Sequence, residues 1–270
     1  MDSPLPSFLI ERMKRWSPKE KEQLRSLFLE EKLSITDIAE RVGRSTASIN
    51  NAITRSGMPR QRWVKKLRMP ESMTPALARI HAHVCGDGHL YLSREKDDYG
   101  YLKAYKHGYY RLRYGFGYTN LNRELIRSFM DDVLEVFGLT PLYYTKQNEV
   151  RVKSKAAWML LKRLGAGGSR KWFLPDEIVQ ASDKVKIAWL SAFFDDEACF
   201  DPSGRIRVRS VNRPGLEQVT LMLSRFVTCH LTPEKGLYRD GSCYLVVSNT
   251  DRDKFLRLIG SIKYSNIKAD

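Results

Sequence analysis

An internal repeat limits the fold of this chain more than any other feature, and it runs from residue 74 to residue 270. Short segments recur there at offsets between 92 and 95 residues. The pairs are "FGLTP" (137–141) with "CHLTP" (229–233), "VRVKS" (150–154) with "YLVVS" (244–248), and "LKRLGA" (161–166) with "LRLIGS" (256–261). A repeat of this kind predicts two half-domains of similar fold, residues 74–168 and 169–270.

Both halves contain the same order of periodic segments: a helix, two strands, a helix, two strands and a helix. In the first half we expect a helix ending near Gly86, strands near 88–93 and 109–119, a helix over 121–137, strands near 141–145 and 148–153, and a helix over 154–164. In the second half the ranges are 184–195, 198–202, 205–211, 214–228, 234–239, 242–248 and 250–260. This order predicts an α+β fold.

Basic residues occupy one face of several predicted strands, and apolar residues occupy the other, because side chains alternate along a strand. The basic residues are Arg111 and Arg113 in one strand, Arg151 and Lys153 in a second, and Arg205, Arg207 and Arg209 in a third. One strand of this kind is usually only a solvated surface. Three in matching places of a repeat favour a cationic platform that binds double-stranded DNA.

The net charge supports an anionic polymer as the partner, since 46 Lys and Arg outnumber 31 Asp and Glu and give a charge of +15. The longest apolar run, residues 156–161, is far shorter than the ~20 residues of a membrane-spanning helix. The N-terminal segment lacks the ~7–15-residue apolar run of a signal peptide. We therefore expect a soluble, intracellular, cytoplasmic protein with its four cysteines reduced.

A small helical domain is predicted over residues 1–57. Ser17, Ser34 and Ser45 each precede a short amphipathic segment, and Gly43 separates the last two segments. Three short helices with a glycine turn predict a helix-turn-helix. Residues 58–73 form a basic connector to the repeated domain, 74–270.

The third of these helices supplies candidate DNA contacts. Ile49 and Ile53 are expected to face inward, which leaves a polar face for the groove and the phosphates. That face carries Thr46, Ser48, Asn50, Asn51 and Arg55. Asparagine is suited to reading adenine, and serine and threonine contact bases or phosphates. The alternative is a three-helix bundle that contacts another protein, and the basic charge of the chain favours DNA.

Two corresponding helices end in an acid. "IHAHVCGDG" (80–88) aligns with "LSAFFDDEA" (190–198), which places Asp87 and Glu197 in the same register. Alanines at matching positions allow the two helices to pack closely. The two carboxylates would then meet near an axis between the halves. Oxygen ligands of this type hold Mg²⁺, and phosphodiester hydrolysis needs charge neutralisation and an activated water.

These two segments resemble the paired LAGLIDADG motifs of homing endonucleases, with Asp87 and Glu197 at the catalytic acid and Gly88 and Ala198 at the last letter. The resemblance covers about residues 74–270. It implies a pseudo-two-fold tandem αββαββα domain whose antiparallel sheets form a saddle over DNA. It further implies an intron-encoded, monomeric nuclease that holds Mg²⁺ between the scissile phosphates through the two acids.

The same resemblance implies one assisting basic residue in each half. Lys171, in "GGSRKWFLP" (167–175), matches the lysine that precedes a proline. In the second half Lys268 follows "IGS", and Lys263 is the alternative.

The acid at position 196 departs from the family pattern, and the paired acids also allow another interpretation. Asp196 stands where a small residue is common, so it either widens the metal site, repels the partner carboxylate, or marks a site that has lost catalysis. Paired acids at an interface also occur as helix caps. His81, His83 and Cys85 have no usual zinc spacing, and we expect His83 to be a polar residue near the interface or the core.

The first half also contains an insertion rich in tyrosine and lysine, residues 93–110, which predicts a hairpin that contacts DNA or a solvated hairpin without a target. Three functions follow from these features. The chain is a site-specific double-strand DNA endonuclease whose helix-turn-helix extends the site, a DNA-binding regulator without cleavage, or a splicing maturase that binds intron RNA.

Overall fold

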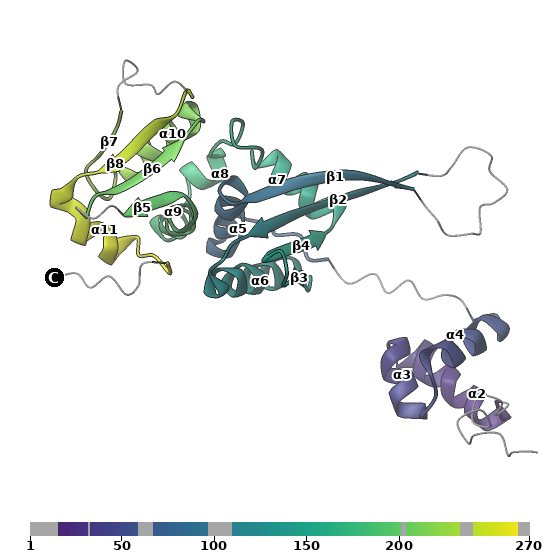
Figure 1. The fold of residues 1–270 in the computed structure, drawn as a ribbon. Coiled ribbons are helices and arrows are strands. Elements are labelled where there is room, and N and C mark those ends of the chain that lie inside the picture. The colour runs from purple at the N-terminus through teal and green to yellow at the C-terminus, as the bar shows by residue number, and fades with distance from the viewer. Residues whose placement is uncertain are drawn as a thin grey trace, which may run out of the picture. The chain divides into compact units, whose positions relative to one another are not determined.

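The structure is a computed structural model that describes residues 16–31, 33–58, 67–96, 110–200, 204–232 and 240–263 (Figure 1). Its contacts divide the chain into two compact units, residues 1–64 and 65–270. The finer boundaries expected from the sequence stay a prediction. Within the described ranges, no helix has both the length and the apolar character needed to cross a membrane.

The N-terminal unit contains the three short helical segments expected from the sequence. They are α2 (Pro18–Arg25) with its continuing turn η1 (Ser26–Glu30), α3 (Ile35–Val42) and α4 (Thr46–Arg55). The side chains of Ser17, Ser34 and Ser45 each accept a hydrogen bond from the amide three residues later, which satisfies the first turn of each helix. Gly43 ends α3 with a φ of 67°, a conformation that favours glycine.

The first half of the larger unit contains the expected order of elements. They are α5 (Pro75–Cys85), β1 (Gly88–Lys96), β2 (Tyr110–Thr119), α6 (Arg123–Phe137), β3 (Leu142–Tyr144), β4 (Glu149–Lys153) and α7 (Lys155–Arg163). The four described strands are antiparallel and lie in the order β1-β2-β4-β3.

The second half repeats this arrangement. It contains α8 (Asp176–Val179), α9 (Asp183–Glu197), β5 (Ala198–Phe200), β6 (Ile206–Ser210), α10 (Arg213–Leu223), β7 (Cys229–Leu231), β8 (Cys243–Val247), η4 (Asn249–Asp251) and α11 (Arg252–Leu258). The described strands form an antiparallel sheet in the order β5-β6-β8-β7, which matches the first sheet position by position. The predicted α+β tandem repeat is therefore confirmed.

Two details of the repeat differ from expectation, and a third is not tested. Helix α10 ends at Leu223 rather than at 228, where the hydroxyl groups of Thr220 and Ser224 donate hydrogen bonds back to main-chain carbonyls. The pairing of "FGLTP" with "CHLTP" was wrong, because the first segment closes α6 and the second forms β7. The strand expected at 234–239 lies outside the described residues.

The strand alternation is confirmed in β4 and β6, but not in β2, where Leu112 is 51% exposed and Arg113 is half-buried. Val150 and Val152 of β4 are buried while Arg151 is exposed, and Ile206 and Val208 of β6 are buried between outward-facing arginines. The buried side chains join one core with the helices, so the basic side chains lie on the face turned away from those helices. The side chain of Arg111 lies outside the described residues.

Candidate active site at the helix interface

Helices α5 and α9 pack against each other and join the two halves (Figure 1). Ala78, Ala82 and Ala192 are fully or almost fully buried along these helices, as the spacing predicted. At Gly86 the approach is closest, because a Cβ there would lie 2.9 Å from the Cβ of Asp196. Close packing therefore requires a residue without a side chain at the end of α5.

Steric contacts also explain why the first motif ends in a glycine, Gly88. A Cβ at Gly88 would lie 2.6 Å from the carbonyl oxygen of His83 and 2.9 Å from that of Gly117. In the second half Ala198 occupies the corresponding place and is buried, with ordinary extended backbone angles of −80° and 142°. The backbone after α9 therefore leaves room for the methyl group of Ala198.

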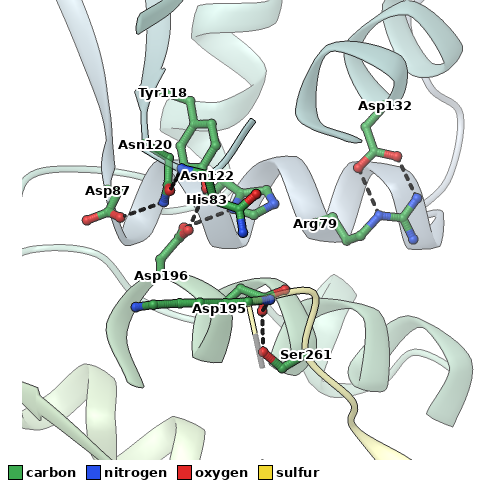
Figure 2. Close-up of polar contacts among 11 residues, drawn as sticks. Arg79, His83, Asp87, Tyr118, Asn120, Asn122, Asp132, Asp195, Asp196 and Ser261 are labelled. Carbon is green, nitrogen blue, oxygen red and sulfur yellow. Dashed lines mark hydrogen bonds and ion pairs between the residues drawn. The ribbon is translucent and has the colours of Figure 1, made fainter. Parts of the chain in front are cut away.

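Asp87 and Glu197 stand at the ends of the two packed helices. Asp87 is exposed, and its Oδ2 accepts a hydrogen bond of 3.1 Å from the side-chain amide of Asn120 (Figure 2). Glu197 is the last residue of α9 and is half-buried. It lines a pocket of about 260 Å³ together with residues that include Gly86 and Arg209.

The two acids share one electrostatic environment. The pKa of Glu197 is raised to about 7, chiefly by desolvation and in addition by the charges of Asp87 and Asp196. Desolvation likewise raises the pKa of Asp87 to about 6, again with the charge of Asp196 adding to the rise. The positive charge of Lys263 lowers both pKa values. Concentrated negative charge of this kind favours a bound cation.

Asp196 is held by residues of the first half. Its carboxylate accepts a hydrogen bond of 2.6 Å from the hydroxyl of Tyr118 and lies 2.9 Å from Nδ1 of His83 (Figure 2). All three side chains are buried. Burial lowers the pKa of His83, but the charge and hydrogen bond of Asp196 outweigh this and raise it. Asp196 therefore links the halves, and His83 lies at the interface as predicted.

Asp195 anchors the segment that follows α11. It accepts hydrogen bonds of 2.5 Å from the hydroxyl of Ser261 and 3.0 Å from the main-chain amide of Lys263 (Figure 2). This contact explains why the charge of Lys263 acts on both acids of the site. Lys268 lies outside the described residues. Lys171 is exposed in a turn directly before Trp172, which lines the pocket beside Glu197.

The other residues of "HAHVCGDGHL" have structural partners. Nδ1 of His81 accepts a hydrogen bond of 2.9 Å from the indole of Trp189, and its Nε2 donates one of 2.9 Å to the carbonyl of Leu164. Burial lowers the pKa of His81 to about 4, which is consistent with this neutral tautomer. The thiol of Cys85 packs against the same ring.

The donor set suits one kind of metal ion. Within the described ranges, no three side chains of His, Cys, Asp or Glu converge to hold a metal. Asp87 and Glu197 could each contribute carboxylate oxygens to a divalent ion. Magnesium binds in this way, through one or two carboxylates together with phosphates and retained waters.

Asn120 and Ser210 are site residues that the sequence reasoning missed. Each accepts the main-chain amide of a following N-cap asparagine, with Asn120 bonding to Asn122 at 2.9 Å and Ser210 to Asn212 at 3.1 Å. They are therefore equivalent in the two halves. Asn120 holds Asp87, and Ser210 lines the pocket of Glu197. The recurring N-cap asparagines were the sequence signal that could have identified them.

Several predicted DNA contacts already have partners within the chain. Arg151 donates two hydrogen bonds, of 2.7 and 2.6 Å, to Glu149. Arg209 donates to Ser242 at 3.0 Å and pairs with Asp240. These acids neutralise part of the positive charge that the strand pattern predicted, so the outer faces are less cationic than expected.

Aromatic rings support the arginines on these faces. The guanidinium of Arg151 lies 4.9 Å from the ring centroid of Tyr144, and Arg207 lies 5.6 Å from that of Tyr244. Such contacts hold guanidinium groups in a fixed orientation. Arg113 is half-buried, whereas Lys153 and Arg205 are exposed.

The candidate reading face of the N-terminal unit is arranged as predicted. Ile49 and Ile53 of α4 are buried, with exposed fractions of 0% and 3%. The polar candidates lie on the opposite side, where Thr46, Asn50, Asn51 and Arg55 are exposed and Ser48 is half-buried.

Comparison with known proteins identifies the fold. Residues 184–260 match the family model described as a LAGLIDADG-like domain. No curated protein matches the chain. Mesophilic variants of the homing endonuclease I-DmoI are 21% identical, with 70% of this chain and 91% of that chain covered and a TM-score of 0.51. A structure of I-DmoI with DNA and Ca is 22% identical, with 70% and 91% covered and a TM-score of 0.50.

Proposed function

We propose that this chain is a site-specific DNA endonuclease that cuts both strands. Its residues 184–260 match a LAGLIDADG-like domain, and its larger unit has the LAGLIDADG homing endonuclease fold. One observation carries the proposal: two desolvated carboxylates lie at the ends of two helices packed between two sheets that carry basic residues. The solved I-DmoI structures include complexes with target DNA in the presence of Mg or Mn.

Asp87 and Glu197 are the residues that would hold the divalent metal, for which we propose Mg²⁺. A bound divalent ion neutralises phosphate charge and makes water a better nucleophile. Asn120 fixes Asp87 by its hydrogen bond to Oδ2, and Asp196 is kept in place by the other half. With one acid from each half, each scissile phosphate would face one carboxylate.

Lysines complete the proposed catalytic site. Lys263 is the C-terminal lysine that we assign to it, because its charge acts on both acids. Lys171 remains the other candidate, directly before Trp172, which lines the pocket of Glu197. Lys268 stays a prediction. Lysine at these places would stabilise negative charge that develops on the phosphate.

DNA recognition is assigned to the outer faces of the sheets and to α4. Arg113, Lys153, Arg205 and Arg207 would contact phosphates or base edges, and the polar face of α4 would extend the site. Because one chain supplies both halves, we propose that the enzyme acts as a monomer.

Cleavage of a plasmid library with Mg²⁺ tests the proposal. Asp87→Asn and Glu197→Gln should each abolish double-strand cleavage while duplex binding persists. Metal-dependent cutting by both variants would contradict the assignment of the acids.

A DNA-binding regulator without cleavage is the second candidate, favoured by the separate three-helix unit with its exposed polar face. Salt-sensitive duplex binding together with no metal-dependent nicking by the unaltered chain would support it. No observation on the described residues favours intron RNA over duplex DNA, and the maturase hypothesis is not carried further.

A further inference from the structure

A cavity of about 460 Å³ lies among α8, α9 and α10, and nothing in the proposed nuclease mechanism uses it. Its volume falls within the range of sites for small organic molecules. Four apolar residues and five polar ones line it: Leu174, Val179, Leu221 and Met222, and Asp176, Lys186, Gln218, Ser224 and Arg225.

Lys186 is the unusual member of this lining. Only 3% of it is exposed, although lysine is almost never buried without a partner. Among the described residues, none gives its ammonium group a hydrogen bond or an ion pair. The aliphatic stem of Lys186 is thus buried while the residue lines the cavity, where an anion would supply the ammonium group with a counter-charge.

The other polar residues of the lining leave the cavity positive. Arg225 adds a second cation, which lies 3.7 Å from the exposed Asp183 at the rim. Gln218 is occupied by accepting a hydrogen bond of 2.9 Å from the amide of Leu174. Asp176 is the one acid in the lining and is exposed. Since Asp183 pairs with Arg225 from outside the lining, the charge of Lys186 is the one that favours a ligand with a single negative charge.

The walls favour an apolar body for that ligand. Leu221 is 72% exposed and Val179 is 38% exposed, and both border the cavity. Exposed apolar side chains around a concave site are typical of ligand-binding surfaces. The combination of an ammonium group in the lining and apolar walls matches an amphipathic carboxylate.

The cavity is separate from the proposed DNA surface. Helix α10 packs on the sheet through Leu216, Val219 and Leu223, whereas the arginines of β6 project from the opposite face. Lys186 and Glu197 lie at opposite ends of α9. A ligand in the cavity therefore would not occupy the nuclease site.

We propose that this cavity binds a medium-chain monocarboxylate, with the carboxylate at Lys186 and Arg225 and the apolar chain against Val179, Leu221 and Met222. The proposal does not depend on nuclease activity. It adds a small-molecule site to the helix side of the second half.

Decanoate is the probe, and binding to the full chain is measured by calorimetry and by shifts of the Met222 methyl signal in NMR. Decanol and decylamine serve as matched probes without the negative charge. We expect one site for decanoate, with at least tenfold weaker binding of decanol and decylamine. Equal binding of decanoate and decanol, or no binding of decanoate below its micelle concentration, would overturn the proposal.

Two variants locate the site. Lys186→Met should weaken decanoate binding at least tenfold and, without ligand, should leave the melting temperature unchanged, since the ammonium group has no hydrogen bond or ion pair among the described residues and methionine keeps the apolar stem. The control Lys184→Met alters an exposed lysine of the same helix and should change nothing. Leu221→Glu, at an exposed position, should also weaken binding without affecting folding. Unchanged decanoate binding in Lys186→Met and Leu221→Glu would refute the assigned site.

Discussion

Replacement of Glu197 by glutamine should stabilise the folded chain at high pH, because the site holds this acid where its charge is unfavourable. The pKa of Glu197 is raised from its usual 4.5 to about 7, chiefly by desolvation. A carboxyl whose pKa is raised on folding contributes its full stability below pH 4.5, and that contribution is lost as the pH rises through 7. Glutamine has no charge to lose.

The size of the effect follows from the same values. At ~1.4 kcal/mol per pKa unit, the rise from 4.5 to about 7 sets an upper limit of about 3.5 kcal/mol above pH 8. Glu197 is half-buried, and water screens part of this energy. We therefore expect Glu197→Gln to increase the free energy of unfolding by about 1–2 kcal/mol at pH 8.5 and by much less at pH 5.

Urea unfolding in EDTA at pH 5 and pH 8.5 measures this difference. Glu177→Gln is the matched control, because Glu177 is exposed on α8 and its pKa is lowered by a main-chain hydrogen bond and by Arg163. That variant should gain no stability at high pH. The reasoning would be refuted if the difference in unfolding free energy between Glu197→Gln and wild type were the same at both pH values. It would also be refuted if the variant were less stable than wild type at pH 8.5.

Three further predictions concern the interface and the sheets. Tyr118→Phe should cost about 1.5–3 kcal/mol in unfolding free energy, because it leaves buried Asp196 without its 2.6 Å donor, and a loss below 0.5 kcal/mol would remove this bond from the account. Gly86→Ala should cost about 1–3 kcal/mol in the same assay, since its Cβ would lie 2.9 Å from Asp196, and an unchanged midpoint would contradict the close packing. Arg207→Ala should weaken duplex binding by about 1–3 kcal/mol, with a flatter salt dependence if it touches phosphate or a relaxed base preference if it reads guanine. Unchanged affinity, salt slope and base preference would place Arg207 outside the interface.

The sequence predicted those helices and strands whose buried side chains recur at a regular spacing along the chain. Helices α5 and α9 and strands β4 and β6 were located because periods of 3.6 and two residues record which side chains face the core. The positions of Asp87 and Glu197 followed from aligning two such helices. Helix α8 and strand β7 were missed, since they span too few residues to show a period, although β3 and β5 of similar length were located.

Contacts between distant residues could not be predicted in this way. Asn120 lies 33 positions from Asp87, and His83 lies 113 positions from Asp196. Before the structure, Asp196 allowed three interpretations. Its two bonds to the first half show that it serves the interface, while its charge still raises the pKa of both site acids. The pairing of Arg209 with Asp240, 31 positions away, was missed for the same reason, whereas Arg151 pairs with Glu149 only two positions away.

The central claim is that Asp87 and Glu197 form one cation-binding site. Mn²⁺ broadening of the side-chain carboxyl signals in NMR tests it most directly and does not depend on cleavage. We expect Mn²⁺ to broaden the signals of Asp87 and Glu197 at concentrations that leave Asp176 and Glu177 sharp, and Asp87→Asn to weaken the broadening at Glu197. Broadening centred on other acids, or an unchanged response of Glu197 in Asp87→Asn, would contradict the shared site.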